Sequence, residues 1–109
     1  MERRLEAILM AQFDIYKRQG GGIEFLLDLQ HDMLESLSTR VVAPLGDLET
    51  VGPPIKTLNP RVSVEGVQYI LLTHLLAAIP ATALGEAVGS ARMQRDEIIS
   101  AVDLLFTGI

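Results

Sequence analysis

The sequence predicts an α+β fold, in which a small, partly open barrel of about five antiparallel strands is followed by one helix packed across it. Short runs of β-branched and other apolar residues recur between positions 13 and 84, separated by clusters of Gly, Pro and Asn. Residues 90–109 have apolar positions at helical spacing instead. Curling the sheet and covering it with that helix is the simplest way to bury the apolar residues of both the strands and the helix.

Composition and charge restrict the class of protein. A chain of 109 residues fits one domain, and 49% hydrophobic residues exceeds what a small monomer needs, which favours a subunit interface. The absence of cysteine excludes disulfides and thiolate metal sites and suits a reducing cytoplasm, where we expect the protein. A net charge of −5 argues against unaided nucleic-acid binding and favours a protein partner. No apolar run approaches the roughly 20 residues that span a membrane.

The first elements divide the chain into an extension and a domain. Met1–Met10 fits a short amphipathic helix with charges of both signs and lacks the pattern of a secretory signal. We treat residues 1–10 as an N-terminal extension, with Met10 as an alternative start, and residues 11–109 as the domain. Phe13–Arg18 is predicted to form a strand, and the three glycines at 20–22 a turn.

The middle of the chain is predicted to contain two strands and a long loop. Ile23–Gln30 alternates in the manner of a strand, although residues 29–37 also fit helical spacing and periodicity cannot decide between the two. Arg40–Leu45 is β-branched and is expected to end at Pro44, because proline is tolerated at strand ends. Gly46–Pro60 contains Gly-Pro-Pro and Asn-Pro and is predicted to be loop.

The last strands and the helix follow from local pattern. Residues 61–65 and 67–73 are predicted to form a hairpin around Glu65-Gly66, and residues 78–84 a final strand. Ser90 is expected to cap a helix that reaches Ile109, with Gly108 near its end. Leu104 falls on the polar side of this helix and is expected to be exposed unless a partner covers it.

Catalytic and metal-binding patterns are weak in this sequence. His31 and His74 are the only histidines and stand in no metal-ligand spacing, so we expect neither metal nor cofactor and no enzymatic activity. His74 is predicted to be a hydrogen-bonded core residue in a strand. The acidic residues Asp28, Asp32 and Glu35 are most simply a solvated strand end and loop.

Several short motifs resemble the CcdB family of bacterial toxins, which poison DNA gyrase. They occur in the family's order and span residues 12–109: Gln12-Phe13-x-x-Tyr16, Leu27-Asp28-Leu29-Gln30-His31-Asp32, Arg40-Val41-Val42-Ala43-Pro44-Leu45, Ile79-Pro80, Leu84-Gly85-Glu86-x-Val88 and Leu104-Leu105-Phe106-x-Gly108-Ile109. The resemblance implies the same SH3-like barrel, a homodimer, and a strand that runs out into a loop after Gln30.

The resemblance also implies partners and site residues. The partners would be the gyrase A subunit (GyrA), trapped in its cleaved-DNA complex, and a CcdA-like antitoxin with which the toxin represses its own operon. The implied gyrase-binding residues are Asp28, Leu29, His31, Asp32, Met33, Leu34, Asp103, Phe106, Thr107, Gly108 and Ile109. The family typically has Trp where this chain has Thr107.

Two other functions remain open at this stage. One is a non-poisoning homologue that retains only the dimer and the antitoxin surface. The other is a ribonuclease, because CcdB-like folds resemble those of MazF and Kid toxins. Asp28, His31 and either Arg40 or Arg61 would then supply the general base, the general acid and the cation that RNA cleavage needs.

Overall fold

A computed structural model describes residues 11–18 and 24–108 of the chain. The predictions for the helix at 1–10, the glycine turn at 20–22 and Ile109 therefore lie outside the described residues. The elements are β1 (Asp14–Arg18), β2 (Phe25–Asp28), η1 (Asp32–Leu34), β3 (Thr39–Asp47), β4 (Arg61–Val64), β5 (Val67–Leu71), η2 (Thr73–Leu75), β6 (Ala77–Pro80), η3 (Ala81–Ala83), β7 (Leu84–Ser90), η4 (Arg92–Gln94) and α2 (Arg95–Thr107), where η marks a 3-10 turn.

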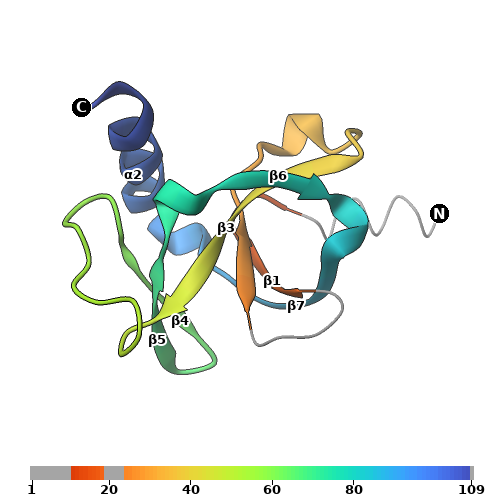
Figure 1. Ribbon diagram of the computed structural model, residues 1–109. Helices are drawn as coiled ribbons and strands as arrows, with labels where there is room; N and C mark the ends of the chain where they lie inside the picture. The colour runs from red at the N-terminus through yellow and green to blue at the C-terminus, as the bar shows by residue number, and fades with distance from the viewer. Residues whose placement is uncertain (1–10, 19–23, 109) are drawn as a thin grey trace.

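The strands form one antiparallel sheet that curls into a half-barrel (Figure 1). Its order is β4-β5-β3-β2-β1-β7, and β6 pairs with β3 outside this path. The α2 helix lies at one end of the sheet, as the blue ribbon in Figure 1 shows. The predicted α+β class is confirmed, with seven strands among the described residues in place of about five.

The predicted hairpin of β4 and β5 is present. Val62 pairs with Tyr69 and Val64 with Val67 across the sheet. Glu65 and Gly66 connect the strands with φ values of 52° and 86°. Positive φ at both central residues is the turn geometry that matches the twist of a two-residue hairpin.

Pro44 lies inside β3, so the prediction that the strand ends there is wrong. One side of β3 pairs with β2, while the other side pairs with β6 through residues 39–42 and with β5 through residues 45–47. The Pro44 carbonyl accepts a hydrogen bond from the Leu72 N–H at this change of partner. In an extended strand the N–H and C=O of one residue face the same neighbour, so the N–H that proline lacks falls where the ladder is already interrupted.

The helix begins later than predicted, because residues 84–90 form a strand. Ser90 ends β7 and pairs with Asp14 of β1, and its hydroxyl accepts a hydrogen bond from the Arg92 N–H in the following turn. The helix itself starts at Arg95. The helix ends at Thr107, and the predicted role of Gly108 at its end is confirmed, since Gly108 adopts the left-handed conformation that closes helices, with φ 79°.

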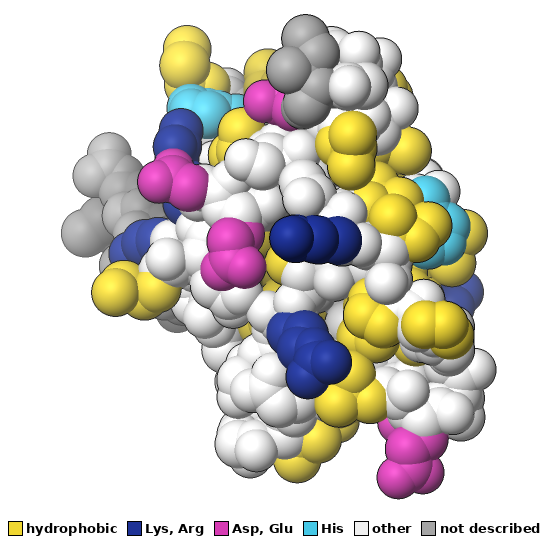
Figure 2. All heavy atoms as spheres, turned by 90° about the vertical axis from the view of Figure 1, so that its left-hand side faces the viewer, with side chains coloured by type: hydrophobic (Ala, Val, Ile, Leu, Met, Phe, Trp, Pro, Cys, Tyr) yellow, Lys and Arg dark blue, Asp and Glu magenta, His cyan; other side chains and the backbone are white. Residues whose placement is uncertain are grey.

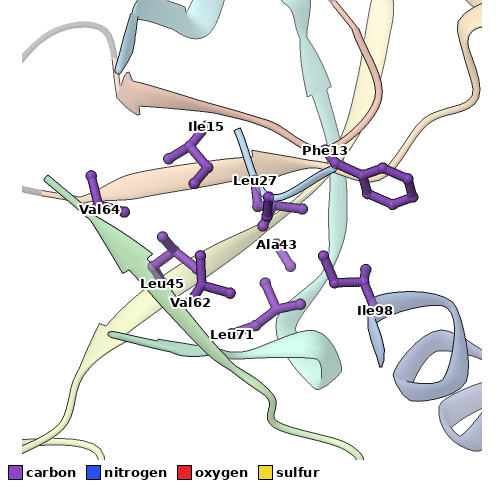
Figure 3. Close-up of a cluster of buried hydrophobic side chains, with 10 residues drawn as sticks. Phe13, Ile15, Leu27, Ala43, Leu45, Val62, Val64, Leu71 and Ile98 are labelled. Atoms are coloured by element: carbon purple, nitrogen blue, oxygen red, sulfur yellow. The ribbon is translucent and has the colours of Figure 1, made fainter. Parts of the chain in front are cut away.

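The hydrophobic core fills the inside of the half-barrel and reaches α2 (Figure 3). Side chains from β1, β2, β3, β4 and β5 converge there, and Ile98 of α2 packs against them from the open end of the sheet. The core residues are Phe13, Ile15, Leu27, Ala43, Leu45, Val62, Val64, Leu71, Ala91 and Ile98. The helix is therefore fixed against the sheet by its inner face.

Two further predictions about single residues are wrong. His74 was expected in the core of a strand, but it lies exposed in the η2 turn, with its Nδ1 atom 3.4 Å from the Asn59 amide nitrogen. Leu104 was expected to be exposed and is partly buried. No helix among the described residues is long and apolar enough to cross a membrane.

Candidate functional site

An apolar groove separates α2 from the loop that follows β2. It has a volume of about 500 Å³, which is within the range of small-ligand sites and peptide-anchoring clefts. We call it the helix–loop groove. Its lining residues are Phe13, Leu29, Gln30, His31, Leu34, Leu37, Thr39, Val41, Leu76, Ile98, Ile99, Val102 and Phe106.

One wall of the groove is the loop of residues 29–37, which contains the η1 turn. His31 caps this turn, because its Nδ1 atom accepts a hydrogen bond from the Met33 N–H at 3.0 Å. The His31 side chain is exposed at the rim of the groove. Met33 is 84% exposed and Leu34 is 49% exposed. Leu34 lines the groove, so its exposed side chain adds to one continuous apolar surface, the kind of patch that marks interaction sites.

The opposite wall is the last turns of α2. Phe106 lines the groove and is 68% exposed, while Asp103 and Thr107 are also exposed. The Thr107 hydroxyl donates a hydrogen bond of 2.6 Å to the Asp103 carbonyl, so it is engaged within the helix itself. The groove therefore joins the two segments implied by the resemblance, through Leu29, His31 and Leu34 on one wall and Phe106 on the other.

Asp28 is not part of this exposed surface. Its side chain is fully buried, and Arg40, which is 2% exposed, donates hydrogen bonds to its Oδ2 atom from Nε at 3.0 Å and from Nη2 at 2.5 Å. The interpretation of Asp28 as part of a solvated acidic cluster is wrong. Burial raises the pKa of the Asp28 carboxyl, although pairing with Arg40 opposes that shift.

The remaining predicted residues occupy different environments. Asp32 is exposed and its Oδ1 atom accepts a hydrogen bond of 2.7 Å from the Gln12 N–H. Gly108 ends the helix beside Thr107, and Ile109 lies outside the described residues. Neither Asp32 nor Gly108 is among the residues that line the groove.

The four residues of the ribonuclease interpretation do not form one open site. Asp28 and Arg40 neutralise each other in the interior, where neither reaches a substrate. The Nδ1 atom of His31 is occupied by the Met33 N–H. Arg61 begins β4 at the far edge of the sheet from β2. General acid–base chemistry needs these groups within hydrogen-bond reach of one substrate, and this arrangement does not provide that.

Sequence reasoning missed several residues of the groove. Thr39 and Val41 of β3, Leu76 after η2, and Ile99 and Val102 of α2 line its floor and sides. Phe13 was assigned to a strand, but it precedes β1 with φ 74°, held by hydrogen bonds from its N–H to the Asp28 carbonyl and from the Ala91 N–H to its own carbonyl. The apolar stripe of the helix was the available signal for Val102.

Exposed apolar side chains also occur outside the groove. Figure 2 views the left-hand side of Figure 1 and shows several groups of hydrophobic side chains separated by polar surface, with basic side chains near the centre. Val51, Ile55 and Leu75 belong to a second hollow of about 400 Å³ beside His74. The protein therefore presents more than one surface on which another chain can pack.

Comparison with known proteins places these features in a family. The family model described as CcdB protein matches residues 12–108, which is nearly the whole domain predicted from the sequence.

Three solved structures with a similar fold are mycobacterial proteins. An endoribonuclease in complex with its cognate antitoxin, from a mycobacterial species, superposes with a TM-score of 0.71 at 12% identity and covers 88% of this chain and 93% of its own. A second mycobacterial endoribonuclease gives 0.71 at 10% identity, covering 88% and 89%. Mycobacterium tuberculosis toxin MazF-mt6 gives 0.70 at 18% identity, covering 85% and 95%. At these identities the likeness concerns the fold alone.

Proposed function

Because the chain belongs to the CcdB family of toxins, we propose that it is the toxin of a type II toxin–antitoxin pair and acts as a cytoplasmic homodimer. Its target in this proposal is the gyrase A subunit, and the dimer stabilises the complex in which gyrase holds cleaved DNA. No covalent step belongs to the toxin, so its contribution is binding free energy alone.

The observation that carries the proposal is the helix–loop groove. Two segments separated by some seventy positions, one around Leu34 and one around Phe106, meet across it, and both expose apolar side chains to solvent. A partner that inserts an apolar side chain here gains contacts from both walls at once. Apolar anchors of this kind commonly dominate the energetics of protein interfaces.

The same surface supports a protein antitoxin. The net charge of −5 favours a partner with basic residues, and the open groove suits an amphipathic segment that folds on binding. A similar fold is known bound to a cognate antitoxin in the mycobacterial endoribonuclease. We propose a CcdA-like antitoxin whose tail occupies the groove, with the toxin–antitoxin complex repressing the shared operon.

Thr107 is the position at which this chain departs from its family. A terminal Trp can fill a pocket in a partner, and interface tryptophans commonly contribute about 2 to 4 kcal/mol. Thr107 is exposed, and its hydroxyl already bonds to the Asp103 carbonyl, so it replaces little of that contact. The deficit corresponds to roughly 30- to 1000-fold in affinity. We therefore propose weak gyrase poisoning.

The test is gyrase-dependent plasmid cleavage with purified protein. Wild type should produce little cleaved plasmid, and Thr107→Trp should raise cleavage by roughly the factor given above. Phe106→Ser in the Thr107→Trp background is the matched control, because it removes an apolar side chain of the groove. A well-folded Thr107→Trp protein that produces no cleavage would contradict gyrase poisoning, because either gyrase is not the target or the binding site has been lost elsewhere.

The proposed homodimer is tested by sedimentation. Sedimentation at micromolar concentration should give about twice the chain mass of 11.9 kDa. A monomer at that concentration would remove the two-fold surface on which gyrase poisoning depends. If the dimer and the antitoxin complex form while Thr107→Trp produces no cleaved plasmid, the protein is the non-poisoning homologue.

A further inference from the structure

We infer that Asp28, Gln30 and Arg40 are positioning residues, which fix the binding loop of residues 29–37 in its partner-ready shape through hydrogen bonds within the protein. The inference rests on the proposed function for the identity of the partner. The loop geometry on which it depends is independent of that identity.

The buried pair anchors the base of the loop. Asp28 ends β2 and Arg40 lies one residue into β3, and their side chains join the two ends of the connection between these strands. The Asp28 Oδ1 atom also accepts a hydrogen bond of 2.9 Å from the Gln30 N–H. Both oxygens of the carboxylate therefore hold the chain where it leaves the sheet.

Gln30 connects the base of the loop to its outer turn. Its Oε1 atom accepts a hydrogen bond from the Val41 N–H at 3.0 Å, and its Nε2 atom donates one to the Leu34 carbonyl at 2.9 Å. Its own carbonyl lies 3.5 Å from the Arg40 Nη2 atom. The buried Gln30 residue thus links β3 and the η1 turn through its side chain, and the ion pair through its backbone.

Gln12 holds the loop from the other side. Its backbone N–H donates to Asp32 Oδ1 at 2.7 Å, and its side-chain amide donates to the Leu29 carbonyl at 3.0 Å. The Leu29 N–H in turn donates to the Val41 carbonyl at 2.8 Å. The polypeptide from Leu29 to Leu34 is therefore bonded to the lead-in of β1 on one side and to β3 on the other.

Core packing does not explain the shape of this loop. The η1 turn contains no buried residue, and every residue from His31 to Thr39 is exposed. An exposed loop that buries little apolar surface is ordinarily mobile. The buried polar network is what restricts it, and a loop already in its bound shape loses less conformational entropy when a partner arrives.

Gln30→Met tests the network, because it keeps the length of the side chain and removes both of its hydrogen bonds. Gln68→Met is the matched control, since Gln68 is exposed on β5. The measurements are backbone NMR order parameters of residues 31–37 in the full chain and affinity for a purified gyrase A fragment. Met33→Ala serves as a variant that removes an exposed contact of the loop without altering its hydrogen bonds.

In Gln30→Met the order parameters of residues 31–37 should fall from about 0.85 to below about 0.6, with the sheet unchanged. Gyrase affinity should fall about tenfold, which corresponds to about 1.4 kcal/mol. Met33→Ala should weaken binding and leave the order parameters at wild-type values, and Gln68→Met should change neither quantity.

Unchanged order in Gln30→Met would overturn the inference, as would a mobile loop that binds gyrase with wild-type affinity. If the wild type itself fails to bind the fragment, the gyrase proposal fails. The order parameters then decide the inference, with binding of a CcdA-like antitoxin as the affinity measurement.

Discussion

Arg40→Met is expected to be among the most destabilising single substitutions outside the apolar core. It leaves the Asp28 carboxylate, which is fully buried, with the Gln30 N–H as its remaining donor in the described part of the chain. Removing one partner of a buried ion pair commonly costs about 3 to 5 kcal/mol. For a domain of this size about 1 kcal/mol lowers Tm by about 4 °C, so the expected loss in Tm is about 12 °C or more.

The cost of Arg40→Met should depend on pH. Burial raises the pKa of Asp28 in the folded protein, and loss of Arg40 removes the main opposition to that shift. A folded state with a raised carboxyl pKa binds more protons than the unfolded state, so stability falls as pH rises through the folded pKa. The loss in free energy of unfolding caused by Arg40→Met should therefore be smaller at pH 5 than at pH 7.5.

Urea unfolding of a double-mutant cycle provides the assay. Asp28→Asn leaves the Arg40 charge unpaired, whereas Asp28→Asn with Arg40→Met removes both charges and keeps an acceptor for the Gln30 N–H. The double variant should be at least as stable as Asp28→Asn alone, with a coupling energy of about 2 kcal/mol or more. Additive losses, or an Arg40→Met cost below about 1 kcal/mol, would refute the buried-pair reasoning.

Three further predictions concern other parts of the chain. Among the described residues the buried Tyr16 hydroxyl has no hydrogen-bond partner, and burial together with the charge of Asp14 raises its pKa. Alkaline pH above the ordinary tyrosine range should therefore favour unfolding, and in thermal melts at pH 10.5 Tyr16→Phe should be more stable than wild type. Glu65→Asn should raise the free energy of unfolding in urea by about 0.5 to 1 kcal/mol, because Glu65 has φ 52° in a hairpin turn that favours Asn-Gly. A chain that starts at Met10 should melt within a few degrees of the full chain, and a larger loss would assign residues 1–9 a packing role.

The fold was largely predictable because its strongest patterns are local. The hairpin around Glu65-Gly66 and the helix closed by Gly108 each carry their own boundary residues. Residues 84–90 carry no such boundary residues. They alternate poorly between buried and exposed positions, and they pair with β1 through register shifts. Such a strand is defined by its distant partner, which explains why the sequence suggested a helix cap at Ser90.

The site was predictable only through the resemblance, and Asp28 shows the limit. Beside Asp32 in the sequence, Asp28 looks like a solvated carboxylate, and its true partner Arg40 is twelve positions away. Only the β2–β3 register, in which Asp28 lies opposite Val42, brings the two side chains together in the interior. Likewise His74 follows an apolar strand, but the chain turns outward at Thr73 and exposes it.

The pairing of β1 with β7 also bears on the order in which the molecule folds. Asp14 lies opposite Ser90, so this pair closes a far longer loop than the neighbouring β4–β5 hairpin does. Closing longer loops costs more entropy, and long-range strand pairing is intrinsically slow. The α2 helix follows β7 and docks on the sheet beyond that pairing. We therefore expect the groove to be among the last features to form, so that a chain with only its first six strands folded carries the binding loop but no complete surface for a target.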